Sequence, residues 1–264
     1  MVRGGMRALL VLLLAASGGA SANEWLTYGH DPERSGWNRD ERALSPKSVP
    51  RLKLIWETQL PVAVKDVALS SLTSPLVATA ITTPQGRRDL VFTVGMDDSL
   101  TALDAATGAA VWRKSFPNDL KPVRAANVNC SNTEQATPVI DKARGVIYFT
   151  TSDGKLRGAG LGDGAEKLAP TQFVAPFSRN WSLNLVDGVV YTAAGRGCGG
   201  TAEEKIEPGT VAAMDVRDPA HPARTQFFTG KGRPAGPWGR GGPWLRRHHR
   251  AADRARHGCG HGCA

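Results

Sequence analysis

Beyond residue 22 the sequence has no stretch typical of an α-helix, because no window carries apolar residues at i, i+3 and i+4 over ten or more positions. This absence excludes a helical repeat, since each helix of such a repeat needs one continuous apolar face. The same part of the chain also has no apolar run long enough to span a bilayer. We therefore expect no transmembrane segment after the N-terminal region.

A repeat of about 56 residues takes the place of helical periodicity. Leu90–Gly108 overlays Val146–Gly164 at an offset of 56, and Trp56 precedes Trp112 by the same number of positions. We predict that each of these tryptophans closes a short apolar strand. A fixed period of several tens of residues indicates a repeat architecture.

A third copy follows at nearly the same spacing. Thr210–Asp215 falls 111 positions after Ser99–Asp104, and a loop rich in Gly and Glu precedes it. Each copy reads as three or four strands of four to six residues, separated by turns such as Asp-Gly and Thr-Gly. The unit is therefore a small antiparallel sheet.

Such a sheet cannot bury both of its faces alone, so copies of it pack face to face as the blades of a β-propeller. We predict an all-β propeller over residues 23–243. At this repeat length an eight-bladed ring needs on the order of 450 residues, whereas the chain holds three to four copies. We expect an incomplete ring, or one that partners complete.

The N-terminus reads as a secretory signal. Arg3 and Arg7 precede an apolar run from Ala8 to Ala16, and Ala20-Ser21-Ala22 forms an A-x-A cleavage site before Asn23. We predict a signal peptide over residues 1–22 and a periplasmic or secreted mature chain.

Residues 244–264 break the blade pattern. They contain five Arg, four of the six His, two of the four Cys and a single aliphatic residue, Leu245, and they show neither strand nor helix periodicity. We interpret this segment as a disordered tail translated out of frame, with a genuine basic tail as the alternative. His257, Cys259, His261 and Cys263 alternate, but they lack the C-x2-4-C and H-x3-5-H spacing of zinc sites, so we predict no metal site there.

Most of the net positive charge of the chain lies at its two ends. The formal net charge is +9, and without the tail and the two signal-peptide arginines it falls to +3 for residues 23–243. A nearly neutral, exported propeller gives no reason to expect nucleic-acid binding. Cys130 and Cys198 lie within the blades, and they are either bridged in an oxidising compartment or two separate thiols.

Two segments carry a family resemblance. Trp25–Leu60, "WLTYGHDPERSGWNRDERALSPKSVPRLKLIWETQL", resembles the opening of pyrroloquinoline-quinone (PQQ) dependent dehydrogenases, and "DSLTALDAATGAAVW" (98–112) is similar to the PQQ-type blade repeat. The resemblance implies an eight-bladed periplasmic propeller with PQQ and Ca²⁺ near its axis, of which this chain represents about the first half. It also implies alcohol oxidation with an aspartate base, in which hydride passes to the quinone.

The chain departs from that pattern at its expected site. The family's adjacent cysteine pair is reduced to Cys130, and "TAAGRGCGG" (192–200) has no carboxylate for a hard cation. The resemblance ends before the expected metal asparagine and base aspartate, so no catalytic residue is assigned. Candidate ligands for a cofactor come from two loops, "VRAANVNCSNTEQ" and "APFSRNWSL". They are Arg124, Asn127, Asn132, Glu134, Arg179 and Trp181.

Arginine can hold a carboxylate through its planar fork, and tryptophan can stack on a flat ring. Two functions therefore stay open at this stage. One is a truncated or non-canonical relative of the PQQ-dependent oxidoreductases, which would take an alcohol and a quinone cofactor. The other is a non-catalytic scaffold that binds a protein partner in the cell envelope.

Overall fold

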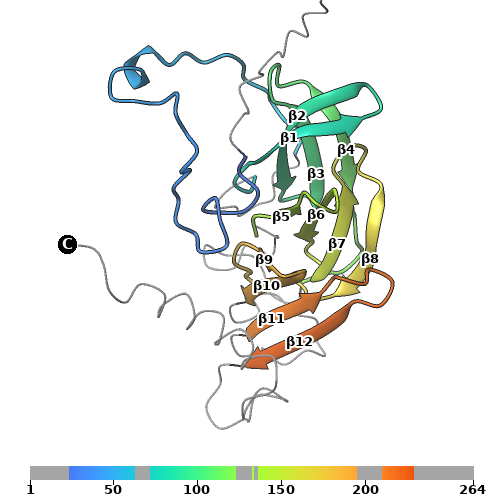
Figure 1. The fold of residues 1–264 in the computed structure, drawn as a ribbon. Helices are drawn as coiled ribbons and strands as arrows, with labels where there is room; N and C mark the ends of the chain where they lie inside the picture. The colour runs from blue at the N-terminus through green and yellow to red at the C-terminus, as the bar shows by residue number, and fades with distance from the viewer. Residues whose placement is uncertain (1–23, 63–71, 123–132, 134–135, 195–209, 229–264) are drawn as a thin grey trace, which may run out of the picture.

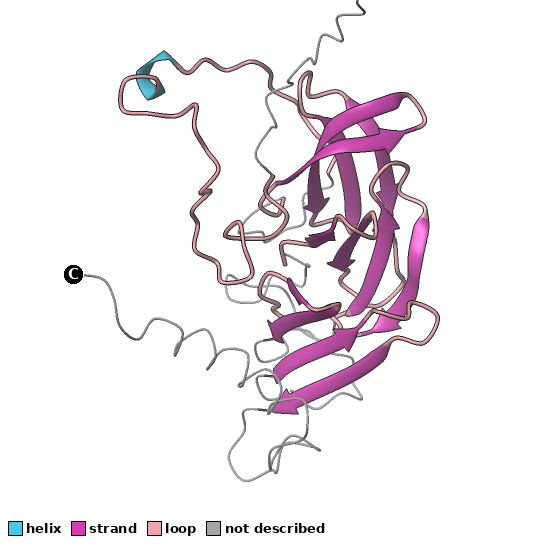
Figure 2. Cartoon of the chain, viewed as in Figure 1, coloured by secondary structure: helices cyan, strands magenta, loops and turns pink. Residues whose placement is uncertain are grey.

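The computed structural model describes residues 24–62, 72–122, 133, 136–194 and 210–228. These ranges contain one short 3-10 helix, η1 (Val49–Arg51), and three four-stranded antiparallel sheets. The sheets follow one another along the chain as three blades, stacked face to face (Figures 1 and 2). The first blade is β1 (Leu76–Thr83), β2 (Gly86–Gly95), β3 (Ser99–Asp104) and β4 (Ala110–Ser115). The second is β5 (Val139–Asp141), β6 (Val146–Thr150), β7 (Lys155–Gly160) and β8 (Glu166–Gln172). The third is β9 (Asn184–Val186), β10 (Val189–Ala194), β11 (Thr210–Asp215) and β12 (Ala223–Phe228).

Within each blade, strands adjacent in the sequence are also neighbours in the sheet. Strands β3, β7 and β11 occupy the same place in their sheets, as the offsets of 56 and 111 residues predict. The prediction of an all-β protein built from repeated blades is confirmed for the described residues.

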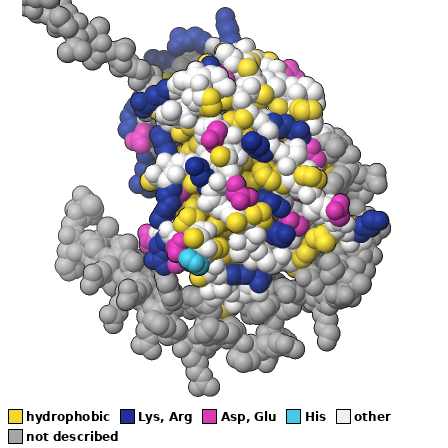
Figure 3. Space-filling model, turned by 90° about the vertical axis from the view of Figure 1, so that its right-hand side faces the viewer, with side chains coloured by type: hydrophobic (Ala, Val, Ile, Leu, Met, Phe, Trp, Pro, Cys, Tyr) yellow, Lys and Arg dark blue, Asp and Glu magenta, His cyan; other side chains and the backbone are white. Residues whose placement is uncertain are grey.

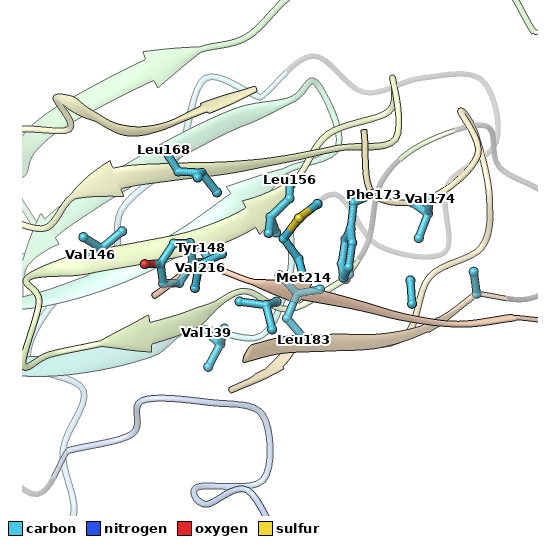
Figure 4. Close-up of a cluster of buried hydrophobic side chains, with 14 residues drawn as sticks. Val139, Val146, Tyr148, Leu156, Leu168, Phe173, Val174, Leu183, Met214 and Val216 are labelled. Atoms are coloured by element: carbon cyan, nitrogen blue, oxygen red, sulfur yellow. The ribbon is translucent and has the colours of Figure 1, made fainter. Parts of the chain in front are cut away.

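The second blade is buried on both faces, which explains why the first four residues of β6, Val146 to Phe149, are hydrophobic. Ile147 and Phe149 point into one core cluster with residues of the first blade, whereas Val146 and Tyr148 point into a second cluster with residues of the third blade. Figure 4 shows the second cluster. Because successive side chains of a strand point to opposite faces, a strand between two cores carries hydrophobic side chains at consecutive positions.

An N-terminal strap, residues 24–34, crosses the side of the stack on which β1, β5 and β9 lie. These three are the inner strands, and β4, β8 and β12 lie at the opposite edge (Figure 1). The strap is hydrogen-bonded to all three blades. Trp25 N–H donates to Val77 O (2.9 Å), Ile140 N–H donates to Leu26 O (2.8 Å), and Asn184 Nδ2 donates to Pro32 O (2.8 Å). The strap therefore ties together blades that otherwise contact one another through their faces.

Two strand predictions are wrong. Trp112 does not close its strand, because β4 continues to Ser115. Residues 52–60, "LKLIWETQL", form no strand, because none of their backbone groups pairs with a strand of the described residues. Side chains attach the segment instead. Trp56 Nε1 donates to the carbonyl of Ala105 at 3.0 Å, and Thr58 Oγ1 donates to that of Gly108 at 2.7 Å.

Several predictions fall outside the described residues. These are the signal peptide over residues 1–22, the tail over residues 244–264, and the pairing of Cys130 with Cys198. Among the helices of the described residues, none has the length and apolar character needed to cross a membrane.

Candidate functional site

The blades share a face that we call the loop face. It contains the β2–β3 turn (96–98), the β6–β7 turn (151–154), the beginnings of the inner strands, and the connector from β8 to β9 (173–183). Hydrogen bonds join these parts, because the N–H groups of Phe173 and Val174 donate to the carbonyl of Gly154 (both 3.0 Å) and Phe177 N–H donates to that of Ser152 (2.8 Å). The connector thus packs over the second blade before it enters the third.

Two of the six predicted ligands lie in this connector, and the structure brings them together. Residues 178–181 alternate between buried and exposed, because Asn180 bridges Ala194 and the segment continues the line of β9. Trp181 N–H donates to the carbonyl of Ala193 at 2.9 Å. Arg179 and Trp181 consequently share the exposed side, with the guanidinium carbon 5.7 Å from the centre of the indole.

Trp181 is 57% exposed, so its indole face is open to solvent, as is that of Trp37, which is 62% exposed. An arginine over an indole face is attracted by the ring quadrupole, so the pair forms a preorganised cationic and aromatic surface. The other four predicted ligands, Arg124, Asn127, Asn132 and Glu134, lie outside the described residues.

A buried polar network at the loop face joins the first two blades, and sequence reasoning missed it. Asp98 is 3% exposed, and its carboxylate accepts bonds from Ser152 N–H (2.8 Å) and from Ser152 Oγ. Asn118 Nδ2 lies 3.3 Å from the same carboxylate and 3.0 Å from Ser152 Oγ. A buried carboxylate is stable only with such donors.

The sequence contains one indication that position 98 lies in a tight turn. Asp98 has φ of +58°, and Gly154, its equivalent at an offset of 56, has φ of +75°. The repeat therefore requires a left-handed residue at this point of the turn, and aspartate is one of the few side chains that tolerate it. The contact to Ser152 has no such signal, because it depends on how two blades pack.

A second polar cluster lies where the strap meets the inner strands. Glu24 accepts bonds from Thr79 N–H (3.1 Å), Thr79 Oγ1 (2.6 Å) and Lys142 Nζ. Burial raises the pKa of Glu24, but the bonds from Lys142 and Thr79 lower it by more, so the pKa lies below the ordinary glutamate value. The carboxylate thus connects the first blade to the second.

The outer edge of the stack has a different character. Figure 3 shows the side on which β4 and β8 lie, where basic, acidic and hydrophobic side chains are interspersed. Such a mixture is ordinary for a solvated surface. The exposed Trp181 and Arg179 of the loop face are therefore a more specific indication of a binding surface than the side chains of the outer edge.

The described residues alone do not enclose a site for PQQ and calcium. Within the described ranges, no three His, Cys, Asp or Glu side chains are grouped so that they could hold a metal ion. Arg179 and Trp181 offer one cation and one open aromatic face, whereas a cofactor site normally encloses most of its ligand. No catalytic step through PQQ follows from these residues.

Comparison with known proteins identifies a family. A family model described as outer membrane protein assembly factor BamB matches residues 53–228. A comparison with curated proteins gave no match.

Solved structures also match the chain. Quinohemoprotein alcohol dehydrogenase ADHIIG from Pseudomonas putida HK5 is 19% identical, with a TM-score of 0.54 over 80% of this chain and 27% of its own. The quinohemoprotein alcohol dehydrogenase of Comamonas testosteroni is 16% identical, with a TM-score of 0.49 over 86% of this chain and 30% of its own. BamB from Moraxella catarrhalis is 16% identical, with a TM-score of 0.36 over 58% of this chain and 47% of its own. The first of these structures supports a PQQ-type propeller fold, and the chain spans less than half of each.

Proposed function

The chain belongs to the family described as outer membrane protein assembly factor BamB, and we propose that it is a periplasmic propeller that binds another envelope protein through its loop face. The observation that carries this proposal is the exposed pair of Trp181 and Arg179. Tryptophan and arginine are the residue types most enriched at the energetic centres of protein interfaces. The extended backbone beneath them is hydrogen-bonded to the end of β10, so the pair is held in place before a partner arrives.

Site-specific photo-crosslinking in cells tests this proposal. A benzophenone amino acid at position 181 should give a discrete adduct with an envelope protein, and the same probe at Lys167, exposed on the outer strand β8, should give none. Arg179→Ala, combined with the probe, should weaken the adduct. Equal adducts at both positions, or none at position 181, would contradict the proposal. Osmotic-shock release of a chain that begins at Asn23 would test the periplasmic location.

A second candidate function is binding of a quinone cofactor such as PQQ, with an alcohol as substrate. The chemistry of the same pair favours it, because an arginine fork suits a carboxylate and an indole suits a flat ring. PQQ titrated with Ca²⁺ present should then quench tryptophan fluorescence in the wild-type chain and not in Trp181→Leu. Saturable quenching that Arg179→Ala weakens would favour the cofactor. Quenching that is identical in all three chains would remove this candidate and leave the protein-binding proposal untouched.

A further inference from the structure

A second pair of an arginine and an aromatic residue lies on the strap, beside the connector that carries Arg179 and Trp181. The guanidinium carbon of Arg34 is 5.7 Å from the centre of the Tyr28 ring, and Tyr28 is 47% exposed. Nη2 of the same guanidinium donates to the carbonyl of Ser182, the residue after Trp181, at 2.6 Å. The strap therefore brings a second exposed ring and cation to the loop face, next to the backbone that holds the first pair.

The guanidinium groups of these two pairs form no ion pair with any described carboxylate. Other arginines at the loop face do, because Arg113 lies 2.8 Å from the carboxylate of Asp97 and Arg157 lies 2.8 Å from that of Asp153. An arginine binds a carboxylate through two parallel N–H donors, and stacking on a ring leaves those donors free. The two cations therefore suit carboxylates that come from another molecule.

Two acidic side chains precede Arg34 in the strap. Asp31 accepts bonds from the hydroxyl and the N–H (2.8 Å) of Ser35, and these bonds hold its pKa below the ordinary aspartate value. Glu33 is exposed. The charge of Glu33 opposes an acidic ligand, so its removal should tighten binding and provides a variant with an effect of opposite sign.

We propose that Tyr28, Arg34, Arg179 and Trp181 form one surface that binds an acidic polypeptide segment, whose carboxylates reach the two guanidinium groups. This inference rests on the proposed function, because it names the chemistry of the segment that the loop face takes from its partner. A polypeptide suits the surface better than a small anion, since the two cations stand on separate elements, the strap and the connector. Only a ligand that extends from one element to the other contacts both.

Fluorescence anisotropy on the full chain tests the proposal, with a short labelled peptide of alternating Glu and Ser as the probe. The acidic peptide should bind saturably, and its affinity should fall as salt is added. A peptide with Gln in place of Glu should bind at least about tenfold more weakly, because an amide cannot replace the charge-assisted contacts. Equal binding of the two peptides would overturn the proposal.

Matched variants locate the binding. Arg34→Ala and Arg179→Ala should each weaken the acidic peptide about tenfold, whereas Arg87→Ala, at an exposed arginine near the start of β2 and away from the β2–β3 turn, should change its affinity by less than about twofold. Arg34→Lys keeps a donor for the Ser182 carbonyl but loses the planar fork, and should give an intermediate loss. Glu33→Gln should tighten binding. Full affinity in both alanine variants at positions 34 and 179, or an equal loss in Arg87→Ala, would overturn the proposal.

A further variant controls for loosening of the strap. Thr27 Oγ1 donates to the carbonyl of Leu183 at 3.2 Å, so Thr27→Val weakens this attachment without changing a charge. It should keep the affinity within about twofold of wild type. A loss as large as that of Arg34→Ala would show that the strap acts only through the position of the connector, and would overturn the proposal.

Photo-crosslinking at position 181 separates this inference from the proposed function. An adduct that Arg34→Glu abolishes supports both. An adduct that Arg34→Glu leaves unchanged would show that the loop face binds a protein through other chemistry, so that this inference alone fails. If no adduct forms at position 181, the proposed function fails.

Discussion

The indole Nε1 of Trp112 donates to the carbonyl oxygen of Leu161 at 2.9 Å, and this bond joins the outermost strand of the first blade to a turn of the second. Leu161 is 2% exposed, so its carbonyl has little access to water and relies on this donor. Since Trp56 makes the same bond to Ala105, the tryptophan contact is repeated along the chain and is not a feature of one loop.

Replacing Trp112 should therefore separate the contribution of the ring from that of the bond. Trp112→Phe keeps an aromatic ring but leaves the Leu161 carbonyl unpaired, and should lower the free energy of unfolding by about 1–2 kcal/mol. Trp112→Ala also removes the packed ring and should cost about 2–4 kcal/mol, below the range for a fully buried tryptophan because the side chain is only half-buried. Urea denaturation measures both, with Trp37→Ala as the exposed control. Equal effects of the two Trp112 variants would show that the ring contributes nothing beyond its N–H.

The glycine beneath that ring gives a second prediction. Gly164 has φ of +66° and faces Trp112, whereas Gly145 has φ of +68° and open space around it. Gly145→Ala should cost about 1 kcal/mol from backbone strain, and Gly164→Ala should cost a further 1–3 kcal/mol or so because the added methyl displaces the indole. Thermal unfolding of the two variants gives the comparison. Equal costs would mean that the backbone strain is the whole effect.

Much of this fold follows from the sequence because its repeat is a local pattern. The period of 56, the alternating strands and the turn glycines predict the blades and their order. The strand expected at residues 52–60 is not formed. A strand needs a neighbouring backbone to bond with, and the sequence pattern does not show whether such a neighbour is present. For the same reason, the sequence does not reveal the bond between Asp98 and Ser152, which lie 54 positions apart in different blades.

The candidate site was predictable in part. Arg179 and Trp181 are two positions apart, so extended backbone directs both to one side, and their pairing follows from local geometry. Sequence alone could not show that Asn180 bridges Ala194 and thereby holds that backbone extended, because this contact depends on the end of β10.

The buried network at Asp98 should show strong coupling to Ser152. Asp98→Asn preserves shape and tolerates the positive φ, but places an amide NH₂ opposite the donors of Ser152 and Asn118, and should cost about 1–3 kcal/mol. Ser152→Ala should cost a similar amount, and the double variant less than their sum by about 0.5–3 kcal/mol. Asp187→Asn, at an exposed turn residue with φ of +49°, is the control and should change stability by about 0.5 kcal/mol or less. Additive costs in the cycle would refute the direct link between the blades.

The polar cluster around Glu24 should make the attachment of the strap depend on pH. The folded chain holds the pKa of Glu24 below its ordinary value, because the bonds from Lys142 and Thr79 outweigh the effect of burial. A lowered pKa stabilises the folded state above the unfolded-state pKa, and that contribution disappears as the pH falls through the folded-state value. Wild type should therefore have a higher melting temperature than Glu24→Gln at pH 7, and the difference should shrink to zero in acid. Glu166→Gln, on the exposed strand β8, should show no such difference at either pH. A gap between wild type and Glu24→Gln that stays constant from neutral to acid pH would show that the carboxylate charge does not hold the strap, and that its neutral hydrogen bonds do.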